Sequence, residues 1–220
     1  YGFIFLGSHE SKNGNPAQLT ADIIDGLSNQ ARMLPKADTA LIYCGGFSGG
    51  GRVAAMMGLS PVRIEGLLTC GAGVAGGAWF GVPPYVIISM AGTSDMNLQE
   101  VKSFSTQKKD LMTRYFQVLY DGKHEWPPLS EMEFSLITFK RMAMRDKKIP
   151  VDETFIRSSG DWLNQYLQTK NDPIQKSESC YNIIRSTEAF ADISSFENQY
   201  QKIKLSSQYK NAVKMEQQLA

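Results

Sequence analysis

Short apolar runs and longer amphipathic segments alternate along the first half of the chain. Each apolar run is rich in aliphatic or aromatic residues and ends in small or polar ones, a pattern typical of buried strands. The expected strands are 1–6, 39–44, 64–70, 85–90 and 116–120. Between them apolar residues recur at helical spacing, and the expected helices are 16–34, 52–57 and 101–114. This alternation predicts an α/β fold with a parallel sheet covered on both faces.

The pattern changes near position 129, where the strand signals stop. Ser130 and Glu133 form a capping box that predicts a helix to about Arg145. The chain then has a helical pattern throughout, over 153–168, 173–190 and 199–219. Apolar residues in these segments suit helical hairpins that pack on each other. We therefore expect an α/β core at 1–145 and an all-helical C-terminal extension at 146–220.

Composition narrows the class of protein. With 220 residues, of which 42% are hydrophobic, the chain can bury a sizeable core. Its net charge of +1 offers no electrostatic reason to expect nucleic acid or an acidic membrane as a partner. No apolar run approaches the length of a membrane span. We expect one sizeable domain, or one domain with an appendage, and no nucleic-acid partner.

Neither the cysteines nor the N-terminus assigns a cellular compartment. Cys44, Cys70 and Cys180 cannot all pair with one another, and we expect buried thiols. The chain opens on Tyr1 with neither an initiator methionine nor a signal peptide. We expect a mature form or a fragment, and the localisation stays open.

The segment 46–50, Gly-Phe-Ser-Gly-Gly, fits the G-x-S-x-G pattern of a nucleophile elbow. A strand is expected before it and a helix after it, as the elbow requires. Serine in so sharp a turn is strained, and we expect a Cβ two residues to either side of Ser48 to clash. The strain presents the hydroxyl at a helix N-terminus, where N–H groups favour developing negative charge. The competing interpretation is a glycine-rich turn without chemistry.

Three polar residues follow successive expected strands in the order Ser48, Asp95, His124. Ligands of an open parallel sheet bind outside the carboxyl ends of its strands, so these side chains are expected to meet. An imidazole can take the proton of a serine hydroxyl, and a buried carboxylate can orient that imidazole. Taken singly, Asp95 suits an ordinary turn and His124 a surface loop. Their joint occurrence at strand ends favours catalysis.

Other residues near these strand ends receive lesser roles. The only other histidine, His9, also follows an expected strand and could line the same cleft, as could Phe47. Asp121 is an alternative partner for the base but ranks below Asp95, because it belongs to the base's own loop. Asn97 suits a helix N-cap better than a role in orienting the acid. The sequence has no metal-ligand spacing, phosphate loop with lysine or dinucleotide fingerprint, so we expect neither metal nor cofactor.

At these places the chain resembles the α/β-hydrolase superfamily. The matching segments are the elbow at 46–50, the acid loop Ala-Gly-Thr-Ser-Asp at 91–95 and the base loop Gly-Lys-His-Glu-Trp-Pro at 122–127. Within the superfamily the chain looks most like the group of polyhydroxybutyrate depolymerases, feruloyl esterases and dienelactone hydrolases. Elbows of the G-F-S-G-G type and a His-x-Trp-Pro base loop are familiar in that group.

The resemblance covers roughly 1–145 and implies hydrolysis of small-molecule or polymer-linked carboxylic esters through an acyl-enzyme, without a cofactor. It implies Ser48 as nucleophile, Asp95 as acid and His124 as base. It also implies that Gly49 supplies one N–H to the oxyanion. The helical extension lies outside the resemblance, and a protein contact through it is possible.

One departure from that family concerns the first strands. The elbow normally follows a fifth strand, whereas one strand is expected before it here. We therefore expect an N-terminally incomplete core whose second oxyanion donor precedes Tyr1. The competing possibility is that 8–13 fold over Ser48 and donate the second N–H.

Two alternative functions stay open. One is a serine peptidase of the same fold. The other is a non-catalytic binding or scaffold protein that uses the helical extension. Labelling by a fluorophosphonate, which requires an activated serine, separates the scaffold from the hydrolases.

Overall fold

The computed structural model describes residues 2–59, 63–74, 84–107 and 113–219, which form two compact units. The first unit comprises 1–128 and the second 129–220. The sequence predicts a boundary after position 145. In the structure, however, the helix that ends at that position belongs to the second unit.

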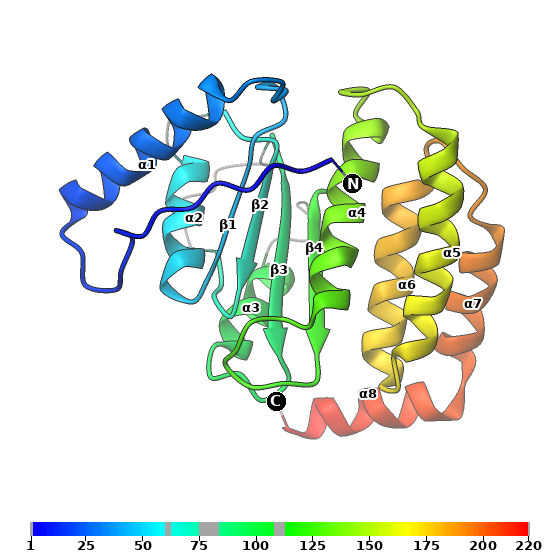
Figure 1. The fold of residues 1–220 in the computed structure, drawn as a ribbon. Helices are drawn as coiled ribbons and strands as arrows, with labels where there is room; N and C mark the ends of the chain where they lie inside the picture. Colours follow the sequence, from blue (N-terminus) through cyan, green and yellow to red (C-terminus); the bar gives the residue numbers. More distant parts are fainter. Residues whose placement is uncertain (1, 60–62, 75–83, 108–112, 220) are drawn as a thin grey trace. The chain divides into compact units, whose positions relative to one another are not determined.

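The first unit is built on a parallel sheet (Figure 1). In the described residues its order is β1 (Tyr43–Phe47), β2 (Gly66–Cys70), β3 (Val86–Gly92) and β4 (Tyr115–Tyr120). All three neighbouring pairs are parallel, and the register aligns the strands' carboxyl ends. The α/β class expected from the sequence is confirmed.

The first unit also contains three helices in its described residues (Figure 1): α1 (Ala17–Met33), α2 (Gly49–Leu59) and α3 (Leu98–Gln107). Helix α2 packs on β1 and β2, whereas α3 packs on β3 and β4. Every residue of β2 and β3 is buried, as expected for parallel strands covered on both faces. Leu67 and Ile87, both fully buried, belong to one hydrophobic core cluster.

The strand expected at 1–6 is wrong for the described residues 2–6, which form no strand. Ile4, Phe5 and Leu6 are 59%, 78% and 42% exposed. A strand needs a hydrogen-bonded neighbour, and this segment makes no ladder with β1. Its contact with that strand is a ring contact between Phe3 and Tyr43, with centroids 5.6 Å apart.

Strand β1 lies later in the chain than the apolar pattern predicts. The side chain of Asp38 accepts from the N–H of Ala40, and its carbonyl accepts from the N–H of Leu41. These bonds hold a turn where a strand was expected. The strand instead runs through Gly45 and Gly46, which pair with Leu68 and Thr69.

The second unit contains α4 (Leu129–Arg145), α5 (Glu153–Thr169), α6 (Pro173–Thr187), α7 (Ser194–Leu205) and α8 (Ser207–Leu219). The described residues 129–219 include no strand. The single helix expected over 199–219 is wrong, because the extended backbone of Ser206 separates α7 from α8. Helix α4 packs with α5 and α6 inside this unit.

A buried polar cluster ties α4 to α5. Glu131 accepts from the hydroxyl of Tyr166 and from the ammonium group of Lys170, each at 2.5 Å. All three residues are buried. Burial and the neighbouring Glu131 raise the pKa of Tyr166 well above its usual value, so the phenol stays protonated and can donate.

Candidate active site

Ser48 stands at the junction of β1 and α2 in a left-handed conformation with φ +53°. Residues other than glycine seldom adopt this conformation, and strain of this kind clusters at functional sites. Two backbone bonds hold the turn. The Ser48 N–H donates to the carbonyl of Cys70 at 2.8 Å, and the Ser48 carbonyl accepts from Arg52 N–H at 3.2 Å. Ser48 is therefore held in a tight turn between a strand and a helix.

The steric role of the glycines differs from expectation at one position. A Cβ on Gly46 would collide with the backbone of Gly50, as expected. A Cβ on Gly50 itself would meet nothing within 4 Å, so the expected clash there is wrong. Within the elbow's own backbone, Gly51 is the tight position instead, because its Cβ would lie 3.0 Å from the Gly46 carbonyl oxygen and 3.2 Å from the Cβ of Ala72.

The structure brings Ser48, His124 and Asp95 together in one hydrogen-bonded chain. His124 Nε2 lies 2.9 Å from Ser48 Oγ, and His124 Nδ1 lies 3.0 Å from Asp95 Oδ1. The Asp95 side chain is fully buried, whereas that of His124 is 21% exposed. A carboxylate at Nδ1 favours the tautomer whose Nε2 can accept the serine proton.

The loop after β3 holds the carboxylate in place. Asp95 Oδ1 also accepts from the backbone N–H of Asn97 at 2.7 Å. The Asn97 side chain donates to the carbonyl of Gly71 at 2.8 Å, which ties this loop to the end of β2. Asn97 does precede α3, and its carbonyl accepts from the N–H of Val101 at 3.2 Å, as at an N-cap position. Its side chain, however, bonds Gly71 and orients the acid loop.

The acid loop and the base loop are also joined to each other. The N–H of Ser94 donates to the Gly122 carbonyl, and the N–H of Thr93 donates to the Tyr120 carbonyl, each at 2.9 Å. Gly92 makes this packing possible, because a Cβ there would collide with the carbonyl oxygen of Gly122. The two loops therefore position Asp95 and His124 as one assembly.

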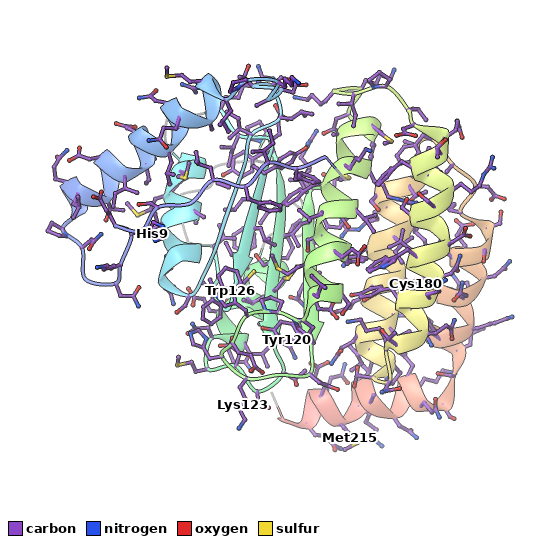
Figure 2. The ribbon with its side chains drawn as sticks, viewed as in Figure 1. His9, Tyr120, Lys123, Trp126, Cys180 and Met215 are labelled. Atoms are coloured by element: carbon purple, nitrogen blue, oxygen red, sulfur yellow. The ribbon has the colours of Figure 1, made fainter. Side chains whose placement is uncertain are left out.

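Aromatic rings lie beside the base. The ring centroid of Phe47 is 4.8 Å from that of His124 and 5.3 Å from that of Trp126. Trp126 is 59% exposed. Figure 2 labels Trp126 close to Tyr120 and Lys123, at the end of the sheet where the base loop lies. Phe47 thus lies at the site, where a substrate-binding role was expected.

The structure does not bring His9 or Asp121 into the hydrogen-bonded chain. His9 is exposed on the loop before α1, and the imidazole bonded to Ser48 is that of His124. Asp121 is exposed, and the carboxylate on His124 is that of Asp95.

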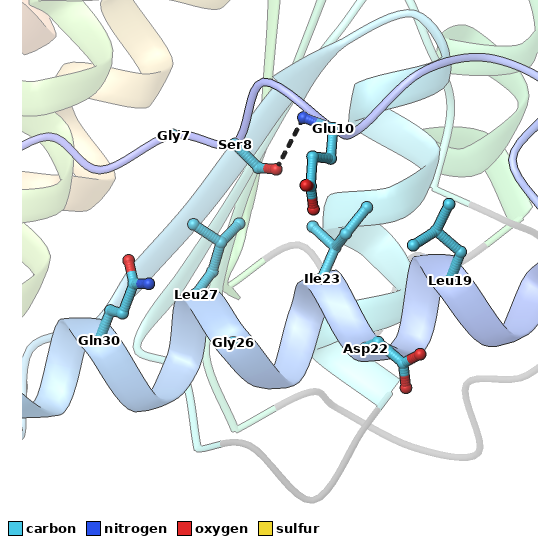
Figure 3. Close-up of a pocket in the computed structure, with 9 residues that line it drawn as sticks. All are labelled: Gly7, Ser8, Glu10, Leu19, Asp22, Ile23, Gly26, Leu27 and Gln30. Atoms are coloured by element: carbon cyan, nitrogen blue, oxygen red, sulfur yellow. Dashed lines mark hydrogen bonds between the residues drawn. The ribbon is translucent and has the colours of Figure 1, made fainter.

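A cavity of about 240 Å³ lies between 7–10 and α1 (Figure 3). None of the three hydrogen-bonded residues lines it. Its lining residues are Gly7, Ser8, Glu10, Leu19, Asp22, Ile23, Gly26, Leu27 and Gln30.

The thiols are not competing nucleophiles. Cys44, Cys70 and Cys180 are free and buried, as expected. Burial raises the pKa of Cys44 and of Cys70 to about 12 and that of Cys180 to about 11. These thiols are protonated at neutral pH and therefore unreactive.

One residue at the site escaped the sequence analysis, and a second was expected there only as part of a longer segment. Gly71, at φ +59°, packs where a Cβ would lie 2.8 Å from Phe47 Cε2 and 3.2 Å from His124 Cε1. The signal in the sequence that could have identified Gly71 is a glycine directly after an expected strand. Asn13 belongs to the segment 8–13 that could fold over Ser48, and its carboxamide lies against Gly49. The sequence pattern suggested a backbone N–H for this approach and did not indicate the side chain.

Within the described ranges, no group of three or more His, Cys, Asp or Glu residues could hold a metal ion. No helix of the described chain is both long and apolar enough to cross a membrane. Comparison of the sequence with family models and with curated proteins found no match. The geometry of the site therefore carries the functional interpretation.

Proposed function

We propose that this protein is a serine hydrolase that cleaves carboxylic esters through an acyl-enzyme. The observation that carries the proposal is the chain from Ser48 Oγ through His124 to Asp95, with contacts of 2.9 Å and 3.0 Å. The strained backbone of Ser48 and its place before α2 support the same function. The proposal includes an α/β-hydrolase type of core, for which the parallel sheet and the elbow are the support.

The reaction follows from the placement of these groups. Ser48 Oγ attacks the ester carbonyl while His124 Nε2 takes the hydroxyl proton. Asp95 stabilises the imidazolium that forms, and the N–H of Gly49 donates to the oxyanion. His124 then returns the proton to the departing alkoxide, which leaves as an alcohol. Water then attacks the acyl group while His124 takes its proton. His124 returns that proton to Ser48 Oγ as the carboxylic acid is released.

The expected helical extension at 146–220 supplies no reacting group in this proposal. It contains no histidine, so it cannot provide the base. A protein contact through these helices stays a prediction.

The proposal is tested on an activated p-nitrophenyl ester and with a fluorophosphonate probe. Ser48→Ala should abolish both turnover and labelling, because the nucleophile is gone. Ser94→Ala is the matched control, since Ser94 is an exposed serine of the acid loop that contributes its backbone N–H. Wild-type turnover in Ser48→Ala, or a wild-type protein that neither turns over esters nor labels, would overturn the function.

The two histidines provide a second comparison. His124→Ala should lower kcat by roughly 10⁴ or more, as is common when a member of such a unit is removed. His9→Ala should cost far less, since His9 is exposed and His124 contacts Ser48. The reverse pattern would assign the base to His9.

A further inference from the structure

The loop before α1 contains a hydrogen-bonded turn with Asn13 near its tip. The N–H of Asn15 donates to the Lys12 carbonyl at 3.3 Å, and Gly14 has φ +86°, as a tight turn with a left-handed third residue requires. The Asn15 side chain donates to the Glu10 carbonyl at 2.8 Å. The Glu10 N–H in turn donates to Ser8 Oγ at 3.1 Å, the dashed line in Figure 3. These bonds shape the loop from within.

This turn brings the Asn13 carboxamide against the residue that follows Ser48. A Cβ on Gly49 would collide with Asn13 Oδ1 and would lie 3.0 Å from Cγ and 3.5 Å from Nδ2. The carboxamide thus occupies the space that a side chain at position 49 would need. Glycine at this position is what allows the approach.

Gly49 is also the residue whose N–H faces developing charge in the proposed reaction. As the first residue of α2, it has an N–H with no partner within the helix ladder. The carboxamide of Asn13 therefore lies against the residue that carries the first oxyanion donor. The terminal torsion of asparagine is broad and roughly two-fold, so rotation can place its N–H₂ group where the oxygen now lies.

We propose that the side-chain amide of Asn13 is the second oxyanion donor of the site, paired with the backbone N–H of Gly49. The inference rests on the proposed ester hydrolysis. Its physical basis is that amide N–H groups directed at the reacting carbonyl stabilise the oxygen that becomes negative when Ser48 Oγ bonds to the carbonyl carbon. No backbone N–H of the loop is needed, because the donor belongs to the side chain.

The test compares Asn13→Asp, Asn13→Ala and Lys12→Ala on the full chain. Asn13→Asp keeps the shape but replaces the N–H₂ donor with a repelling oxygen, and Asn13→Ala removes the group. Each should lower kcat and kcat/KM together by about 10²–10³, with KM and Tm near wild type. Lys12→Ala should match wild type, because the turn uses the backbone carbonyl of Lys12 and not its side chain.

A boronic acid gives a readout that a structural role would not move. It forms a tetrahedral anionic adduct on the serine, so its affinity should fall by a similar factor in both Asn13 variants. The affinity of the neutral alcohol product should not change. Wild-type kcat and boronate affinity in the Asn13 variants, or a loss confined to KM or to Tm, would overturn the inference alone. A wild-type protein without turnover or labelling would overturn the proposed function and this inference with it.

Discussion

Replacing Gly92 with alanine should separate the base from the nucleophile. Gly92 ends β3, and its backbone does not require glycine, because its φ is not positive. The added Cβ would lie 2.6 Å from both the carbonyl carbon of Gly122 and the carbonyl oxygen of Lys123, and it would collide with the oxygen of Gly122. The atoms it meets are backbone, so no side-chain rotation relieves the contact. The base loop must move.

The size of the effect follows from these distances. Ordinary van der Waals contact begins at 3.4 Å, so the backbone next to His124 must retreat by roughly 1 Å. The 2.9 Å contact between His124 Nε2 and Ser48 Oγ would then exceed hydrogen-bonding distance. A misplacement of this size costs about 10²-fold in rate, and overpacking costs about 1–3 kcal/mol in the free energy of unfolding.

The assay measures kcat/KM on a p-nitrophenyl ester, the rate of fluorophosphonate labelling and Tm. Gly26→Ala in α1 is the matched control, since a Cβ there meets nothing within 4 Å. That change should leave the rate unchanged and raise helix stability by up to about 1 kcal/mol. If Gly92→Ala keeps both the wild-type rate and the wild-type Tm, the base loop is not held by this packing and the reasoning fails.

Three further outcomes are expected. Gly50→Ala should keep kcat/KM within about tenfold of wild type despite its place in the elbow motif, because its Cβ meets nothing within 4 Å; inactivation would show a constraint that the geometry lacks. Lys170→Met should lower the free energy of unfolding in urea by about 3–5 kcal/mol, because it strands the buried carboxylate of Glu131, and adding Glu131→Gln should restore part of the loss. Burial raises the pKa of Cys44 and Cys70 from 9.0 to about 12, so their contribution to stability is complete below pH 9 and is lost as pH rises from 9 towards 12. Urea unfolding at pH 8 and pH 10.5 measures this, and an unchanged pH dependence after replacing both cysteines with serine would contradict it.

The sheet was predictable where burial leaves a continuous apolar pattern. Strands β2 and β3 are buried at every position, and their runs of Leu, Val and Ile predict this burial. The grouping of Ser48, Asp95 and His124 was also predictable, because parallel strands place their carboxyl ends at one edge of the sheet. Periodicity and topology together thus located both the sheet and the hydrogen-bonded chain.

What the sequence did not reveal depends on contacts between distant residues. The apolar residues 2–6 read as a strand, but strand formation depends on a hydrogen-bonded neighbour, which the pattern of one segment does not report. The approach of Asn13 to Gly49 arises from a turn in one segment and a missing side chain in another. The helical pattern continues through Ser206, whose extended backbone ends α7, so the pattern did not predict this break.

The hydrogen-bonded chain has a consequence for how the first unit assembles. Ser48 and His124 are 76 positions apart, and the path that joins them crosses the whole parallel sheet from β1 to β4. Contacts of such long sequence separation form slowly, because the chain entropy between them must first be lost. A partly folded form in which β4 has not docked would hold the serine without its imidazole. Recovery of fluorophosphonate reactivity during refolding would therefore report completion of the sheet, and it should lag behind the return of helical signal.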